Sequence, residues 1–227
     1  MKNDYRITIG RDQLAQLLSY WGLSLKRNIQ KRTVSMIQKI LILLAGKANL
    51  LIRSIITKPF QAISSDMTEL IYKGGKAYLC VHKDVFGQMV YGYKLGMHMT
   101  KDLVIESFEM AVKTMRGYVG TELLHMLCHQ DQGSQYTSYE YVRIVQAVMQ
   151  ISYSDPGTPT HNPGQESFFG RFKDEWRGVI AEIETYEELE KFVNEKLKYY
   201  NEGRIHTKVG YTSPLNYTKA FLENARK

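Results

Sequence analysis

The chain of 227 residues is long enough for one well-packed domain and a smaller appendage, and its 44% hydrophobic and 23% charged residues are ordinary for a soluble globular protein. The formal net charge of +7 permits a polyanionic partner without proving one. A membrane span is excluded, because the most apolar stretch, 40–56, is interrupted by Lys47, Asn49 and Arg53 and falls short of the roughly 18 uninterrupted residues that a bilayer requires.

The first part of the chain is strongly basic. Residues 1–58 carry eleven basic and two acidic side chains, a net charge of +9, so the remaining residues sum to −2. We interpret this arm as a surface that contacts DNA phosphates, and a solvated helix pair is the alternative. The candidate DNA-binding side chains within it are Arg11, Lys26, Arg27, Lys31 and Arg32.

Two helices are predicted within residues 10–45. Apolar residues recur at helical spacing up to Gly22, and a second apolar run spans 33–44. The intervening WGLSLKR resembles a helix-turn-helix junction, but a helical hairpin that only packs fits this pattern equally well. Residues 46–60 read as a linker, so we place the first region at 1–58 and a second domain at 59–227.

Strand-like patterns follow the linker. Three strands are expected at 62–72, 77–83 and 89–94, with turn signals at Gly74-Gly75 and near Gly87. They predict a three-stranded antiparallel meander.

Helices and short apolar runs then alternate. Thr100 caps a helix that precedes a buried strand at 123–128, and Ser138 caps a helix that precedes a strand at 151–154. A further helix covers 162–176. This order predicts an α/β fold with a mixed five-stranded sheet and helices on both faces, which is the order of the ribonuclease-H-like fold.

The last long helix is expected to start at Thr185, with Glu188 completing a capping box. Cys80 and Cys128 lie in apolar runs and lack the spacing of a zinc site, so we expect buried free thiols. This usage, and an opening segment without the apolar region of a signal peptide, suit a cytoplasmic protein.

Three acidic residues lie at positions that indicate a functional role for a carboxylate. Asp131 follows a buried strand, at the end where open sheets place ligands. Asp66 lies within a strand, where a carboxylate is costly unless it is paired or coordinated. Glu166 lies near the start of a helix. The alternatives are that Asp131 is an ordinary turn residue, that Asp66 lies at an exposed strand end, and that Glu166 is an ordinary surface charge. Asp84 is the other candidate for the first carboxylate.

The helix that carries Glu166 has two stripes. At about 100° per residue, Glu166, Lys173 and Arg177 share one side, while the aromatic residues 168, 169, 172 and 176 share another. The aromatic side is expected to face the core. The first stripe is then free to offer a carboxylate to metal and two cations to phosphates. Arg204 and Lys208 are further phosphate candidates.

Three carboxylates from separate segments indicate a site for hard cations such as Mg²⁺ or Mn²⁺. Two such ions, roughly 3.5–4 Å apart, neutralise the attacking and leaving oxygens in phosphoryl transfer.

Several segments closely resemble one family. HQDQGSQYTS, PGTPTHNPGQESFFGRFKDE and YYNEGRIHTKVGYTSP, together with SSDMTEL and YRITIGRDQLAQLL, resemble the integrase-like insertion-sequence transposases in the catalytic frame usually called OrfB. The resemblance covers nearly the whole chain in order. It implies an integrase core whose DDE triad maps onto Asp66, Asp131 and Glu166.

The resemblance also implies an activity and partners. We expect metal-dependent cleavage and strand transfer at insertion-sequence ends, on double-stranded end and target DNA. We also expect a homo-oligomer in the bacterial cytoplasm near the nucleoid, with the product of an upstream partner frame as a further partner.

Two departures from the family keep an alternative open. There are 34 residues between Asp131 and Glu166, where the family usually has 35, and less helical sequence precedes YRITIG than is usual. The alternative is a truncated, catalytically impaired relic that only binds DNA. A plain ribonuclease-H-type nuclease is a second alternative.

Overall fold

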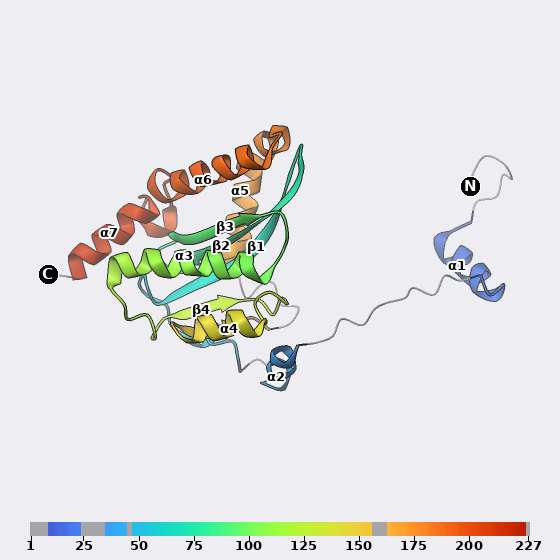
Figure 1. The fold of residues 1–227 in the computed structure, drawn as a ribbon, viewed down its shortest axis with the longest axis horizontal. Coiled ribbons are helices and arrows are strands. Elements are labelled where there is room, and N and C mark those ends of the chain that lie inside the picture. The colour runs from blue at the N-terminus through green and yellow to red at the C-terminus, as the bar shows by residue number, and fades with distance from the viewer. Residues whose placement is uncertain (1–8, 24–34, 45–46, 156–162, 226–227) are drawn as a thin grey trace. The chain divides into compact units, whose positions relative to one another are not determined.

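The computed structural model describes residues 9–23, 35–44, 47–155 and 163–225 (Figure 1). The chain divides into two compact units, Met1–Thr33 and Val34–Lys227. In the first, α1 (Arg11–Tyr20) ends in a turn with Gly22 at a positive φ of 66°. The expected helix-turn-helix junction continues into residues 24–34, which lie outside the described part of the chain.

The second unit is built on the predicted five-stranded sheet, in the order β3-β2-β1-β4-β5. β1 pairs antiparallel with β2, and β2 with β3, whereas β4 pairs parallel with both β1 and β5. This arrangement confirms the meander followed by alternating helices and strands. The strands are β1 (Ala62–Tyr72), β2 (Gly75–Asp84), β3 (Val90–Gly96), β4 (Leu127–Gln130) and β5 (Gln150–Tyr153).

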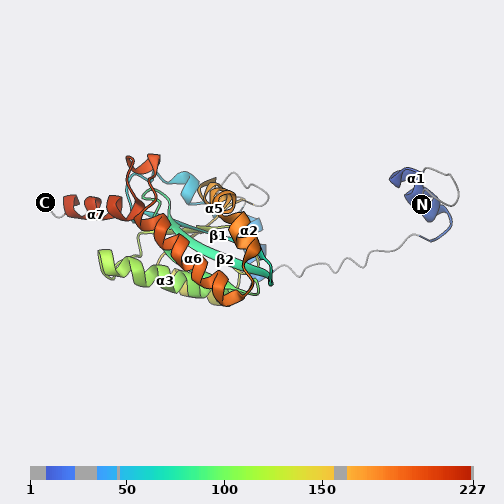
Figure 2. The ribbon, with the colours of Figure 1, turned by 90° about the horizontal axis from the view of Figure 1, so that it is seen from above.

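Helices cover both faces of the sheet (Figure 2). α3 and α4 pack on one face, and α5 and α6 pack on the other. Their bounds are α3 (Lys101–Val119), α4 (Tyr139–Gln146), α5 (Pro163–Glu182) and α6 (Tyr186–Glu202). The fold is therefore ribonuclease-H-like, as predicted.

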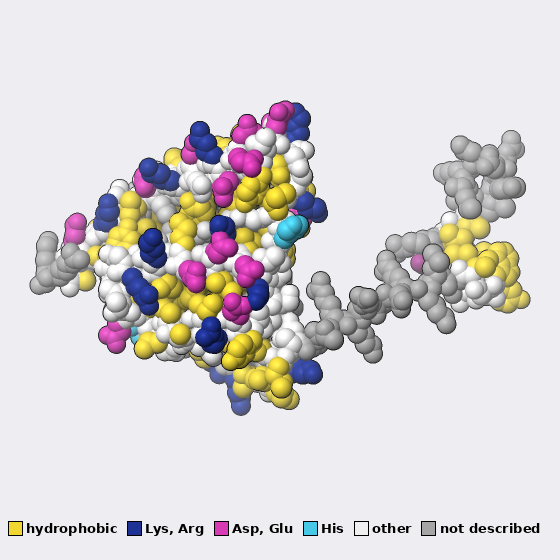
Figure 3. Space-filling model, in the orientation of Figure 1, with side chains coloured by type: hydrophobic (Ala, Val, Ile, Leu, Met, Phe, Trp, Pro, Cys, Tyr) yellow, Lys and Arg dark blue, Asp and Glu magenta, His cyan; other side chains and the backbone are white. Residues whose placement is uncertain are grey.

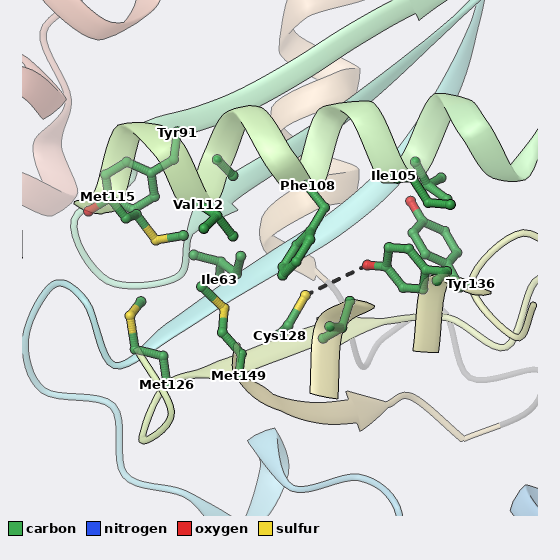
Figure 4. Close-up of a cluster of buried hydrophobic side chains, with 14 of the residues drawn as sticks. Ile63, Tyr91, Ile105, Phe108, Val112, Met115, Met126, Cys128, Tyr136 and Met149 are labelled. Carbon is green, nitrogen blue, oxygen red and sulfur yellow. Dashed lines mark hydrogen bonds between the residues drawn. The ribbon is translucent and has the colours of Figure 1, made fainter. Parts of the chain in front are cut away.

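Successive side chains of β2 point to opposite faces of the sheet, so β2 contributes to both hydrophobic cores. Leu79 and Val81 face α5 and α6, whereas Cys80 belongs to the core beneath α3 and α4. Figure 4 shows the second of these cores, in which Phe108 of α3 lies over the sheet near Cys128. Both cysteines are buried free thiols, as expected.

α3 lies unusually close to the sheet at Gly92. A Cβ atom at this position would come within 2.2 Å of the Ser107 carbonyl oxygen and 2.4 Å of the Ala111 nitrogen. Only glycine permits this approach of the helix backbone to β3. Gly92 therefore sets the depth at which α3 seals one face of the sheet.

The predicted caps form at the expected residues. Thr100 accepts a hydrogen bond from the Leu103 amide, and Ser138 accepts one from the Tyr141 amide. At the start of α6, Thr185 and Glu188 form the reciprocal capping box.

One further helix follows α6 in the structure. The helix that begins after Thr185 was expected to be the last long one, but α7 (Pro214–Ala225) comes after a short 3-10 turn, η3 (Thr207–Val209). A proline at the first helical position and the Ser213 hydroxyl, which accepts from the Asn216 amide, start this helix.

The sheet-bearing unit also includes the segment before β1. α2 (Met36–Leu44) buries Leu41 in the core beneath α3, and the amides of Leu50 and Leu51 donate to the Ser152 hydroxyl on β5. The compact unit thus begins at Val34, whereas composition placed the boundary after residue 58. In the described ranges, no helix combines the length and apolar character needed to cross a bilayer.

Candidate active site

Asp66 lies in the middle of β1, opposite Val81 of β2. Side chains alternate along a strand, so Asp66 faces the same side as Leu70 and Tyr72, which pack in the core beneath α5 and α6. The Met67 amide donates to its Oδ1 at 2.7 Å. The first predicted carboxylate is therefore half-buried on the α5 side of the sheet.

Asp131 follows the last residue of β4. The first three residues of β4 each pair with the β1 residue numbered 65 below, as in Ser64 with His129. The register ends there, so Asp131 lies just beyond the pairing, where the chain leaves the strand next to β1. The Asp131 side chain is exposed and its Oδ1 accepts from the Gly133 amide at 2.8 Å, which holds it in a tight turn.

Glu166 is exposed in the first turns of α5. The residue before it, Gln165, is fully buried, and its Nε2 donates to the Ser64 carbonyl oxygen at 2.5 Å. Because Ser64 is two residues from Asp66, this hydrogen bond holds the start of α5 beside the carboxylate of β1. No local pattern in the sequence marks Gln165 as part of the site.

The electrostatics of Asp66 connect the three acids. Burial is the largest cause that raises the pKa of Asp66 to about 6, and the negative charges of Asp131 and Glu166 raise it further. The Met67 amide and the Lys173 ammonium act in the opposite direction. The structure thus brings Asp66, Asp131, Glu166 and Lys173 into one electrostatic neighbourhood.

The same acids do not close into a ligand cluster. In the described ranges, no group of three or more Asp, Glu, His or Cys side chains is arranged to hold one metal ion. The carboxylates therefore act on one another through their charges without converging on a single point.

The rival carboxylate, Asp84, has a structural role. It is fully buried and accepts from the amides of Phe60, Phe86 and Gly87 at 2.9, 2.9 and 2.6 Å. The Tyr91 hydroxyl donates to it at 3.2 Å. With these donors, Asp84 organises the β2–β3 turn.

The predicted cations fall into separate places. Lys173 acts on Asp66, and Arg177 is exposed one helical turn further along α5. Arg204 and Lys208 instead line a pocket that contains none of the three acids. Arg11 begins α1 in the other compact unit, and the remaining arm candidates lie outside the described residues: Lys26, Arg27, Lys31 and Arg32.

A hydrogen bond that the sequence did not reveal fastens the Asp131 segment. The hydroxyls of Ser65 and Tyr136 lie 2.9 Å apart, and the Tyr153 hydroxyl donates to the Tyr136 carbonyl oxygen at 2.8 Å. His129, just before the segment, shares a 2.9 Å hydrogen bond with Ser152. The loop that carries Asp131 is therefore tied to β1 and β5, its neighbouring strands.

The fold, with Asp66 on β1, Asp131 just after β4 and Glu166 on α5, defines a ribonuclease-H-like protein of the integrase-core type. Two sequence profiles described as an integrase core domain match residues 56–159 and 147–214. The structure is also similar to a simian T-cell lymphotropic virus intasome determined in complex with PP2A regulatory subunit B56 gamma. That match has a TM-score of 0.55 and 15% identity over 90% of this chain and 73% of the other, and it supports the fold alone.

Two relatives are similar in sequence. An uncharacterized transposase-like protein of Haemophilus influenzae is 35% identical over 163 residues, which cover 71% of this chain and 72% of that protein. A 31 kDa protein of insertion element IS600 from Shigella sonnei is 31% identical over 223 residues, which cover 96% and 78%. The chain belongs to the integrase-core family of insertion-sequence transposases.

Proposed function

We propose that this chain cleaves and joins DNA strands at insertion-sequence ends, with Asp66, Asp131 and Glu166 as its catalytic carboxylates. The observation that supports this most directly is the raised pKa of Asp66, to which the charges of Asp131 and Glu166 contribute. Perturbed carboxylates that act on one another are typical of active sites. Membership of the transposase family supports the same assignment.

The donor set fits Mg²⁺ or Mn²⁺. All three side chains offer oxygen ligands, and the repulsion among them is what a divalent cation would relieve. Asp66 and Asp131 would hold the metal, and Glu166 would complete a site for a second ion. Bound divalent ions supply charge neutralisation at the attacking and leaving oxygens of a phosphodiester.

The other residues of the site position the substrate. Lys173 lies in the field of Asp66 and, with Arg177, forms a cationic stripe beside Glu166. These side chains would orient the phosphate that is cut, while water or a terminal 3′-hydroxyl attacks in line. The hydrogen bond of Gln165 to Ser64 would position Glu166, and that of Tyr136 to Ser65 would position the Asp131 segment.

The substrate and partners follow from the family. Double-stranded DNA of the element ends and of the target would be bound, with the basic residues of 1–58 on the end DNA. In line with the family, the working form would be a homo-oligomer that holds two element ends. The product of an upstream frame, either fused or supplied separately, would be a further component.

The test is cleavage of duplex DNA that carries the element's terminal repeats, in Mg²⁺ or Mn²⁺, by the wild type and by Glu166→Gln. We expect the variant to bind this DNA normally and to lose cleavage. Binding without cleavage by the wild type would indicate the truncated relic instead. Preferential cleavage of RNA–DNA hybrids would indicate a ribonuclease-H-type nuclease.

A further inference from the structure

A basic pocket lies between α5, α6 and the segment 204–208. Its volume is about 170 Å³. Four cationic side chains line it, and the only acidic one among its described lining residues is Glu175. The cations are Arg171, Lys196, Arg204 and Lys208.

Most of this positive charge is uncompensated. Glu175 forms an ion pair with Arg204, which ties the segment after α6 to α5. Arg171, Lys196 and Lys208 form no ion pair with any residue that the structure describes. The pocket therefore carries a surplus of three positive charges, which favours the binding of an anion.

The lining is organised rather than loose. The Lys196 ammonium lies 4.2 Å from the centroid of the Trp176 ring, which fixes the side chain by a cation–π contact. Gln88, in the left-handed region at φ 62°, lines the pocket, and its Oε1 accepts from the Nζ of the buried Lys83 at 3.0 Å. A fifth cation thus lies immediately behind the lining.

A buried nitrogen adds to this picture. Nε2 of His206 is inaccessible to solvent and makes no hydrogen bond within the described part of the chain. Burial lowers the pKa of His206 to about 4, and the nearby charges of Arg204, Lys83 and Arg171 lower it further. The ring is therefore neutral at pH 7, so the positive charge of the pocket comes from its Arg and Lys side chains.

The pocket is distinct from the candidate active site. Arg171 is five residues after Glu166, so it projects about 140° away around the axis of α5. Asp66, Asp131 and Glu166 are absent from the lining. One helix thus presents the carboxylate on one flank and this cationic pocket on the other.

We propose that this pocket binds a phosphodiester group of a DNA strand, separate from the phosphodiester that is cut. The inference rests on the proposed function, because that function supplies DNA as the ligand. Guanidinium and ammonium groups are the usual partners of phosphate oxygens. Tyr199, half exposed among the lining residues, offers a face on which an unpaired base can stack.

Elsewhere on the surface, cations are paired with acidic side chains. The face shown in Figure 3 carries cations and acids interspersed over α3 and α6. Lys94 of β3 pairs with Glu106 of α3, and Lys101 of α3 pairs with Glu140 of α4. A cation that is paired with a carboxylate attracts DNA phosphates less strongly than an unpaired one.

The experiment measures DNA affinity without divalent metal, by fluorescence anisotropy of a labelled 30-nucleotide duplex and of the matching single strand. The variant is Arg171→Gln with Lys208→Gln, two exposed residues whose substitution leaves the cores intact. We expect its affinity to fall roughly tenfold or more for at least one probe, since hydrogen bonds to charged groups are lost. The slope of log affinity against log salt should fall by about one.

The matched control is Lys113→Gln with Arg116→Gln, which removes the same charge from exposed positions on α3. It should change the affinity far less. Loss for the duplex alone identifies paired DNA as the ligand, and loss for the single strand alone identifies unpaired DNA. An unchanged affinity for both probes, or equal losses in the two double variants, would overturn the proposal. Because the readout is binding, a wild type that binds but does not cleave would sink the proposed function alone.

Discussion

The Ser65 hydroxyl, next to Asp66 on β1, shares a 2.9 Å hydrogen bond with the Tyr136 hydroxyl, in the segment that begins with Asp131. Both side chains are buried. One hydrogen bond therefore connects the strand that carries the first carboxylate to the loop that carries the second. It lies on the face of the sheet opposite Asp66, where solvent and substrate do not reach it.

Tyr136→Phe should weaken this connection. The Ser65 hydroxyl would lose a buried partner, so we expect a loss of about 1–3 kcal/mol in the free energy of unfolding. We also expect slower single-turnover cleavage with unchanged DNA affinity, because the Asp131 loop is less well held. Urea denaturation and a cleavage time course measure the two effects. Cleavage at the wild-type rate despite the lost stability would show that the bond supports the fold alone.

Gln165→Met should separate positioning from stability in the same way on α5. Methionine fills a similar volume but cannot donate to the Ser64 carbonyl oxygen, so the start of α5 loses its attachment to β1. We expect cleavage to fall at least tenfold, with a stability loss of about 1–3 kcal/mol. Gln150→Met is the control, because Gln150 is exposed and lies at the end of β5 away from the Asp131 loop. If both variants cleave at equal rates, Gln165 does not position Glu166.

Asp84→Asn should lower the free energy of unfolding at pH 7 without divalent metal, whereas Asp66→Asn should not. In Asp84→Asn, an NH₂ group replaces one of the two oxygens that accept hydrogen bonds in the β2–β3 turn, so a donor then faces other donors. We expect the free energy of unfolding to fall by about 2–4 kcal/mol. Asp66→Asn removes a charge that burial and two other acids disfavour, so stability should be unchanged or higher. Urea denaturation compares them, and a large loss in Asp66→Asn would mean that its carboxylate is structural.

Lys83 should make stability depend on pH. Burial lowers the pKa of its ammonium to about 8, below the ordinary 10.5. The neutral amine of Lys83 makes its full contribution to the free energy of unfolding above pH 10.5. This contribution is lost as the pH falls through 8, because folding then buries a charged ammonium. Relative to Lys83→Met, the wild type should therefore gain about 2 kcal/mol between pH 7 and pH 9.5.

Urea denaturation at the two pH values measures this gain, with Lys113→Met on the surface of α3 as the control. The control should leave the pH dependence of the wild type intact. A wild type and a Lys83→Met variant with parallel pH profiles would contradict the lowered pKa.

The sequence predicted those elements that carry local signals. Thr100, Ser138 and Thr185 start their helices as expected, since each cap depends on residues within three positions. The strand expected at 123–128 begins only at Leu127, because apolar Leu123 and Met126 fill the core from a turn instead. A buried apolar run does not by itself distinguish these two outcomes.

The site was predictable only in outline. Positions at strand ends and on a helical stripe indicated Asp131 and Glu166, but the contact of Gln165 with Ser64 spans 101 residues and leaves no local signal. The helical periodicity of α5 places Arg171 on the flank away from Glu166. Its pocket nevertheless depends on how α6 and the segment 204–208 pack against that flank.

The central claim is that Asp66, Asp131 and Glu166 jointly bind divalent metal. Crystals of the protein soaked in Mn²⁺ test it most directly through the anomalous signal of the metal. We predict anomalous peaks with oxygen ligands from all three side chains, and their loss in a Glu166→Gln, Asp131→Asn double variant. Full metal occupancy elsewhere, with the three carboxylates left uncoordinated, would contradict the claim.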